Sequence, residues 1–230
     1  MTQPIPVDPL PTDPSGQDDS ATEPKTVVIE IADEDLRVLR RSGYRLCFAK
    51  RIQAQPFNVV WQAFEEFFSS NHLSWIHSFE LFGSALFLPY ATVRVSTNVV
   101  RIDTGEQSVL DSDGLLEAPS TGGPADAVTM VNRFGTIRAG VSQTVTGLQG
   151  ESHSLPIYVS AEPVPLEANP LVPVDEVLVW FEQDATTSMM LPDRPGQPQE
   201  MVSRSKGTVV DMSGSDVQTR LYAGQEWSTP

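Results

Sequence analysis

The sequence predicts a mainly β protein: an antiparallel β sandwich of about ten or more short strands, with one short helix near the N-terminus and a disordered N-terminal leader. Many segments alternate apolar and polar residues with a period of two, which turns one face of a strand towards a core. Loops rich in glycine, proline and aspartate separate these segments at short intervals. The length of 230 residues suits one such domain with a tail.

The first 25 residues differ in composition from the rest of the chain. They hold six prolines, five acidic residues and no aromatic side chain, so they cannot bury enough apolar area to offset the entropy lost on ordering. We therefore predict a disordered leader over residues 1–25 and a single β-sandwich domain over residues 26–230, with a sub-boundary inside the proline-rich stretch 161–175. The leader is either a plain solvated tail or a docking tail for a partner.

The formal net charge of −15 limits the partners of the protein. A nucleic-acid groove needs lysine and arginine to replace the counterions of the phosphates, and an anionic membrane surface attracts the same charge. We therefore expect no nucleic-acid partner. A protein partner, self-assembly into an oligomer, a glycan and a neutral lipid are all compatible with this charge.

Cys47 is the only cysteine in the sequence, so no disulfide forms within the chain. We interpret it as a small buried thiol rather than a nucleophile, because no histidine or asparagine accompanies it in a recognised pattern. The N-terminus lacks the basic and apolar regions of a signal peptide, and no apolar run approaches the roughly 20 residues of a membrane span. The expected location is therefore cytoplasmic, with non-classical export as the alternative, and no transmembrane segment is expected.

The domain is predicted to begin with a strand, a short helix and a second strand. Thr26–Ile31 has the β-branched run of a strand, and Asp33 is placed to cap a helix that ends before Gly43 at the C′ position. We attribute the arginines near the helix end to complementarity with the helix dipole rather than to an anion site. These arginines are Arg37, Arg40 and Arg41.

The stretch from Gly43 to Phe68 is typical of two antiparallel strands joined by a turn at Pro56. Alternate residues of the first strand share one face, which we predict to lie on the core: Tyr44, Leu46 and Phe48. The charged side chains of the stretch are predicted to lie solvated on the outer face, namely Arg45, Lys50 and Arg51.

Aromatic residues crowd the end of this stretch and the strand predicted to follow it at Leu73–Phe87. Aromatic residues at this density usually fill a sandwich core, but they also suit a site that stacks on sugar rings or on a lipid headgroup. A tryptophan near the C-terminus is expected to dock on the sandwich or, in the second interpretation, to join the site. The candidate ligand-binding residues are Phe64, Trp75, His77 and Trp227.

Several strands are predicted in the second half of the chain. The stretch 162–176 has four prolines in eleven residues, so it is excluded from the centre of a sheet and is expected to cross between sheets. Glu176–Gln183 is apolar on both faces and is predicted to be a central strand. We expect it to form a hairpin with residues 188–190, and residues 206–212 to form one with residues 216–224. The other predicted strands are Tyr90–Ile102 with a kink, Ser108–Leu110, two strands within Val128–Gly147, and Leu155–Ser160.

No residue pattern indicates a metal site, a cofactor or a catalytic centre, so none of these is expected. His72 and His77 lie on opposite faces of an ideal strand and cannot chelate one metal ion. Asp111, Asp113 and Gly114 are similar to the start of a calcium loop, but the remaining ligands are missing and a turn explains these residues. The sequence contains no nucleophile elbow, phosphate-binding loop, zinc-protease or C-x-x-C motif.

These features favour a non-catalytic β-sandwich module that binds or assembles with a partner. A protein or a second copy of the chain is the first expectation for this partner, and a glycan or a neutral lipid is the next. One alternative is a membrane-active protein, similar in outline to lectin-like and haemolysin-like sandwiches, that inserts aromatic side chains into lipid. The other is a hydrolase with a carboxylate pair such as Glu65 and Glu66.

Overall fold

The computed structural model describes residues 23–192 and 207–230 of the chain. Most of the predicted leader, and most of the polar loop after residue 190, lie outside the described residues. Lys25, the last residue assigned to the leader, already belongs to the first strand. The elements of the described residues are α1 Asp33–Arg41 and the strands β1 Lys25–Ile31, β2 Arg45–Ala49, β3 Gln62–Phe64, β4 Ser70–Ser84, β5 Val100–Ile102, β6 Glu106–Leu110, β7 Ser120–Thr121, β8 Val128–Asn132, β9 Arg138–Thr146, β10 Ser152–Val159, β11 Ala168–Leu171, β12 Glu176–Glu182, β13 Thr208–Asp211, β14 Val217–Ala223 and β15 Glu226–Ser228.

The strands form three sheets, which confirms the predicted mainly β fold with one short helix. The large sheet has seven strands in the order β10-β9-β4-β1-β14-β15, with β5 also paired to β4. The second sheet has the order β13-β12-β2-β3, and the small sheet has the order β11-β8-β6-β7. Most pairs are antiparallel as predicted, but β1 with β14 and β6 with β8 are parallel.

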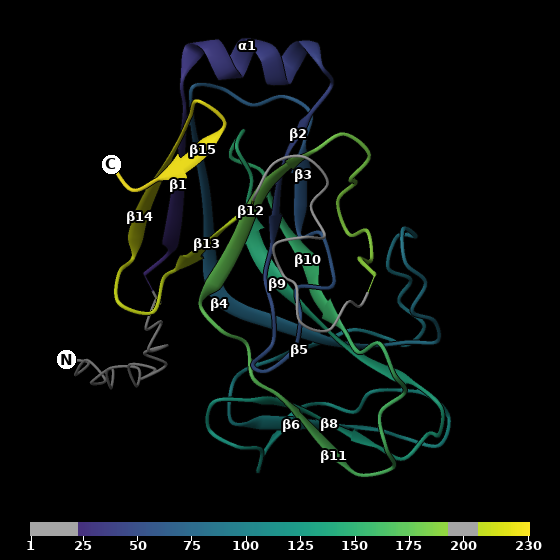
Figure 1. Ribbon diagram of the computed structural model, residues 1–230. Coiled ribbons are helices and arrows are strands. Elements are labelled where there is room, and N and C mark those ends of the chain that lie inside the picture. Colours follow the sequence, from purple (N-terminus) through teal and green to yellow (C-terminus); the bar gives the residue numbers. More distant parts are fainter. Residues whose placement is uncertain (1–22, 193–206) are drawn as a thin grey trace, which may run out of the picture.

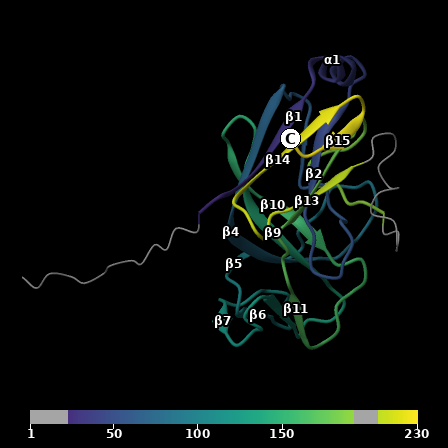
Figure 2. The same cartoon turned by 60° about the vertical axis from the view of Figure 1, so that its left-hand side comes forward.

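The large and second sheets pack face to face as a sandwich. Phe181 of β12 lies against Tyr222 of β14, with 4.8 Å between the ring centroids, so inner side chains of the two sheets meet. In Figure 1, α1 lies across one end of the sandwich and the small sheet lies at the opposite end. Figure 2 gives the same order from a second direction. Within the described ranges, no helix has the length and apolar character needed to cross a membrane.

The second sheet is buried on both faces, although the sequence predicts only one core face for β2. Leu46 and Phe48 contribute to the main core, as predicted. Cys47 and Ala49, on the opposite face of β2, are also fully buried in a second apolar cluster that includes Trp180. The prediction that Cys47 is a small buried thiol is therefore confirmed.

Helix α1 begins one residue earlier than the predicted cap allows. Ala32 occupies the N-cap position without a side-chain hydrogen bond, so Asp33 is the first helical residue and does not cap the helix. Acidic side chains fill the first turn and basic side chains the last turn, as the helix dipole favours. Gly43 follows with φ +70°, a left-handed conformation that suits glycine at C′.

Both predicted hairpins in the C-terminal third are wrong. β12 pairs with β2 and β13, whereas Met189 and Met190 form isolated bridges to Thr92 and Val59. β13 pairs with β12, whereas β14 lies parallel to β1 in the other sheet. Alternation identifies a strand but does not select its partner, because pairing also depends on burial by distant segments. The central position predicted for β12 is confirmed.

Three other loop and edge features follow from local chemistry. Of the strand predicted at Tyr90–Ile102, only β5 forms. Side-chain oxygens of Thr97 and Ser96 accept hydrogen bonds from the backbone N–H groups of Gly83 and Ala85, and these bonds replace the pairing of a regular strand there.

The proline-rich stretch contributes only β11, at the edge of the small sheet, as its prolines require. In the acidic loop, the carboxylate of one aspartate accepts the backbone N–H groups of two residues further along, so the turn interpretation is confirmed: Asp111 accepts from Asp113 and Leu115.

Candidate functional site

The four candidate residues from the sequence do not form one cluster. Trp75 is buried in the main core, whereas His77, two residues further along β4, is exposed beside Asp175. Phe64 packs edge-on against Phe48, with 6.0 Å between the ring centroids. Trp227 stacks on Phe181 at 5.6 Å. Ligand binding by these residues stays a prediction.

A buried lysine lies beside Trp75. Lys50, predicted to be solvated, has only 1% of its surface exposed. It follows β2 on the core face, and its Nζ lies 4.8 Å from the ring centroid of Trp75 and 5.6 Å from that of Trp61. The electron-rich ring faces stabilise the ammonium by cation–π attraction, which explains how a lysine is accommodated between the sheets.

Asp175, just before β12, compensates this buried charge and links it to the large sheet. Its Oδ1 lies 3.8 Å from Lys50 Nζ and 3.5 Å from His77 Nε2. Its Oδ2 lies 3.2 Å from the Nζ of Lys25, which also donates a hydrogen bond to the backbone oxygen of Met212 at 2.6 Å. We name Lys25, Lys50, His77 and Asp175 the ionic cluster.

Burial and charge pull the pKa values of the ionic cluster in opposite directions. Burial lowers the pKa of Lys50 to about 7, although the nearby Asp175 carboxylate partly opposes this shift. Burial by itself would raise the pKa of Asp175, but His77, whose Nε2 lies 3.5 Å from Oδ1, and the charge of Lys50 lower it to about 2. Near pH 7 the cluster therefore holds an ionised carboxylate and a lysine close to its titration point.

The ionic cluster is suited to holding the two sheets together rather than to chemistry on a ligand. Lys50 is enclosed by tryptophan rings, so a substrate has no open approach to its amine. In the described part of the chain, no group of three or more histidine, cysteine, aspartate or glutamate side chains is arranged to hold a metal ion.

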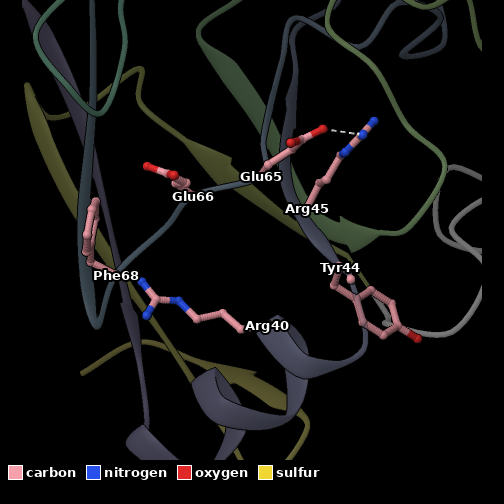
Figure 3. A pocket seen from close by; sticks show the side chains of 7 residues that line it. Arg40, Tyr44, Arg45, Glu65, Glu66 and Phe68 are labelled. Carbon is pink, nitrogen blue, oxygen red and sulfur yellow. Dashed lines mark hydrogen bonds and ion pairs between the residues drawn. The ribbon is translucent and has the colours of Figure 1, made fainter.

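An open pocket lies between the C-terminal end of α1 and the segment that follows β3 (Figure 3). Its volume is about 480 Å³. The helix end, the start of β2 and the loop after β3 each contribute to its wall. The residues that line it are Arg40, Gly43, Tyr44, Arg45, Glu65, Glu66 and Phe68.

Internal contacts hold two arginines of the pocket in place. Arg40 donates from Nε to the backbone oxygen of Phe67 at 2.9 Å, and its guanidinium carbon lies 5.5 Å from the ring centroid of Phe68. Arg45 forms an ion pair with Glu65, and in Figure 3 these two side chains point towards one another. The pocket wall is therefore organised before any ligand arrives.

Two other side chains of the pocket remain available to a ligand. Phe68 is 47% exposed, which is high for an aromatic ring. Glu66 is exposed and makes no hydrogen bond or ion pair with the residues that the structure describes. Two carboxylates and two guanidinium groups balance the formal charge of the wall. This arrangement favours a neutral, polar ligand over an anion or a cation.

The chain matches no protein-family model, no curated protein and no solved structure in comparisons with known proteins. The interpretation of the pocket and the ionic cluster therefore depends on their geometry alone.

Sequence reasoning missed this pocket because its residues carry separate local explanations. Arg40 is explained as a helix-end charge, and its position there is correct, but its guanidinium also reaches the loop after β3. The run of phenylalanines and glutamates from Phe64 to Phe68 contained a signal. β3 ends at Phe64, so strand alternation does not extend to Phe68, and the signal is only the close spacing of aromatic and acidic side chains, which are groups that contact polar ligands.

Proposed function

We propose that this protein is a non-catalytic binding module whose pocket below α1 takes a neutral carbohydrate. The observation that carries the proposal is the exposed ring of Phe68 beside the exposed carboxylate of Glu66 and the fixed guanidinium of Arg40. A ring face stacks on the C–H groups of a sugar, while carboxylate and guanidinium groups bond its hydroxyls. The volume of about 480 Å³ falls within the range of roughly 300–1,000 Å³ that is common for small-ligand sites.

The charges of the chain support a neutral ligand. A net charge of −15 disfavours polyanionic glycans, because a bound anion would meet a repulsive field. The pocket wall has no excess positive charge to attract sulfate or carboxylate groups, because Glu65 and Glu66 balance Arg40 and Arg45.

The proposal is tested by applying the labelled full-length chain to an array of neutral and acidic glycans. The affinity for each glycan that binds is then measured by titration calorimetry. We expect binding to neutral glycans that falls by about tenfold or more in Phe68→Ala and in Glu66→Gln. The matched control is Val38→Ala, because Val38 is exposed on α1 but does not line the pocket. Unchanged affinity in both pocket variants would show that the glycan does not bind in this pocket.

The same samples separate a binding module from a hydrolase and from a self-assembling protein. Mass spectrometry of the glycan after long incubation should return it uncleaved. Cleavage that is lost in Glu65→Gln or Glu66→Gln would instead support the carboxylate-pair alternative. Light scattering measures assembly directly, and a defined oligomer that dissociates on glycan addition would assign the pocket to a contact between copies.

A further inference from the structure

The segment between β4 and β5 exposes several large apolar side chains close together. Leu86 is 60% exposed, Leu88 is 58% exposed and Tyr90 is 70% exposed, all within five residues. Val95 and Val99, further along the same segment, are also exposed. Several large apolar side chains exposed in one short segment mark an interaction site more often than isolated exposed residues do.

This segment is held in a fixed conformation by its neighbours. Phe87 and Val93 point inward and pack against a small apolar cluster that includes Phe82. The backbone N–H of Tyr90 donates to the oxygen of Met190 at 2.7 Å, and Met190 donates back to the oxygen of Ala91 at 2.9 Å. The exposed side chains are therefore presented from an anchored backbone, which reduces the entropy lost on docking.

The backbone conformation of Tyr90 is a second indication that this segment forms a binding surface. Its φ is +68°, a left-handed conformation that is uncommon for a residue with a side chain. Strained backbone of this kind persists where surrounding contacts enforce it, and it concentrates at binding and functional sites.

The charge of the segment differs from that of the rest of the chain. Residues 81–102 contain no aspartate or glutamate, although the chain has 30 acidic residues. The same residues include Arg94 and Arg101. A third arginine, Arg138, donates from Nη1 to the backbone oxygen of Ala85 at 3.0 Å, at the start of the exposed segment. The exposed apolar side chains thus adjoin guanidinium groups and no carboxylate from their own segment.

We propose that the 85–95 segment docks on a membrane surface of zwitterionic lipid. Leu86 and Leu88 would enter the boundary between headgroups and acyl chains, and Tyr90 would lie at the headgroup level, where amphipathic rings collect. Arg94 is placed to meet lipid phosphate. The net charge of −15 opposes approach to an anionic bilayer, so a phosphatidylcholine surface fits this chain better than a phosphatidylserine surface.

This surface is independent of the carbohydrate pocket. No residue of the segment lines the pocket, which is built at the α1 end of the sandwich. In Figure 1, the segment after β4 loops out at the right of the molecule, whereas α1 lies at the top.

The test is co-flotation of the full-length protein with phosphatidylcholine vesicles and with vesicles that also contain phosphatidylserine. We expect binding to the first and weaker binding to the second. The double variant Leu86→Ser, Leu88→Ser should lower the partition coefficient by about tenfold or more, because two exposed leucines no longer enter lipid. The control is Leu166→Ser, a leucine in another loop that is slightly more exposed (69%) than Leu86 and Leu88. Unchanged thermal melting of the double variant confirms that it still folds.

Tyr90→Trp gives an independent measurement in the folded protein. Vesicle binding should shift the emission of this tryptophan to the blue and allow its quenching by brominated phosphatidylcholine. The proposal is overturned if the protein floats with neither vesicle, or if the double variant binds as well as the unmodified chain. A dimer in light scattering that the double variant abolishes would also overturn it, since a second copy would then cover the segment.

Discussion

The charged groups of Lys50 and Asp175 lie 3.8 Å apart on the core side of the second sheet, although one residue follows β2 and the other precedes β12. Asp175 also forms an ion pair with Lys25 of β1 and lies 3.5 Å from Nε2 of His77 in β4, so a single carboxylate contacts both sheets of the sandwich. A buried charge of this kind costs desolvation energy that only good pairing offsets. Its consequences should therefore appear in stability and in its dependence on pH.

The first prediction concerns Lys50→Met. Burial lowers the pKa of Lys50 to about 7 in the folded state, below its ordinary value near 10.5 in the unfolded chain. Between these values the unfolded chain holds the proton and the folded protein does not, so stability rises with pH. This group should add roughly 1 kcal/mol to the free energy of unfolding per pH unit from pH 7 to pH 9. Urea unfolding at several pH values should show that Lys50→Met removes this rise.

Arg51→Met is the control for Lys50→Met. Arg51 is the next residue, but it is only partly buried and forms an ion pair with Glu176, with 2.6 Å between Nη2 and Oε2. Its replacement should change the free energy of unfolding by about 1 kcal/mol or less and leave the pH dependence unaltered. If both variants keep the rise above pH 7, Lys50 is not its source.

The second prediction concerns Asp175→Asn. The substitution leaves the amine of Lys50 buried without its counterion, which typically costs about 3–5 kcal/mol. The loss should be largest near pH 6, where Lys50 carries its proton, and clearly smaller at pH 9, where the amine is neutral. Chemical unfolding at these two pH values measures the difference. An equal loss at both would show that Asp175 acts through its ion pair with Lys25 or through packing, and not through the charge of Lys50.

The third prediction concerns acid unfolding. The pKa of Asp175 is lowered to about 2 in the folded state, so its contribution is complete above about pH 4 and disappears as the pH falls towards 2. This group should account for roughly 2 kcal/mol of the stability lost in that window. Asp175→Asn should therefore show a shallower decline between pH 4 and pH 2 than the unmodified protein. Parallel curves for the two proteins would contradict this assignment.

Local patterns were sufficient to predict several elements but not the ionic cluster. The alternation in β4 and the two apolar faces of β12 depend on neighbouring residues alone, and both strands form, although β4 spans Ser70–Ser84 rather than Leu73–Phe87. The period of two also places Lys50 on the face of Leu46 and Phe48, where it is buried, so the prediction that Lys50 is solvated on the outer face is wrong. That prediction rested on the charge of Lys50. The carboxylate that compensates this charge, Asp175, lies far along the chain, so the sequence does not reveal the pairing.

Long-range pairing and the pocket were not predictable for a related reason. β14 lies beside β1 from the opposite end of the chain, and a parallel pair leaves no turn between its strands for the sequence to reveal. The pocket likewise joins Arg40 of α1 to Glu66 and Phe68, which follow β3. The charge and aromatic character of these side chains are visible in the sequence, but their proximity arises only from the path of the chain.

The fourth prediction concerns the thiol of Cys47. This side chain is fully buried, and burial raises the pKa of the thiol well above its usual range. Because the thiolate is the reactive form, a thiol reagent such as Ellman's reagent should label the native protein at pH 8 only through transient opening. The same reagent should label the urea-unfolded chain rapidly and at one equivalent. Rapid labelling under native conditions would place Cys47 at the surface.

The fifth prediction concerns the contact of Gly140 in β9 with Phe82 in β4. These residues are directly paired across the strands, and a Cβ at position 140 would overlap the Phe82 ring, which is fully buried. Gly140→Ala should therefore lower the free energy of unfolding by about 1–3 kcal/mol, the usual cost of overpacking. The double variant Gly140→Ala, Phe82→Leu should lose less than the sum of the two single variants, because the smaller side chain removes the overlap. Gly214→Ala is the control, since no atom lies within 4 Å of its added Cβ. Additive losses in the double variant would show that the ring does not require a glycine opposite it.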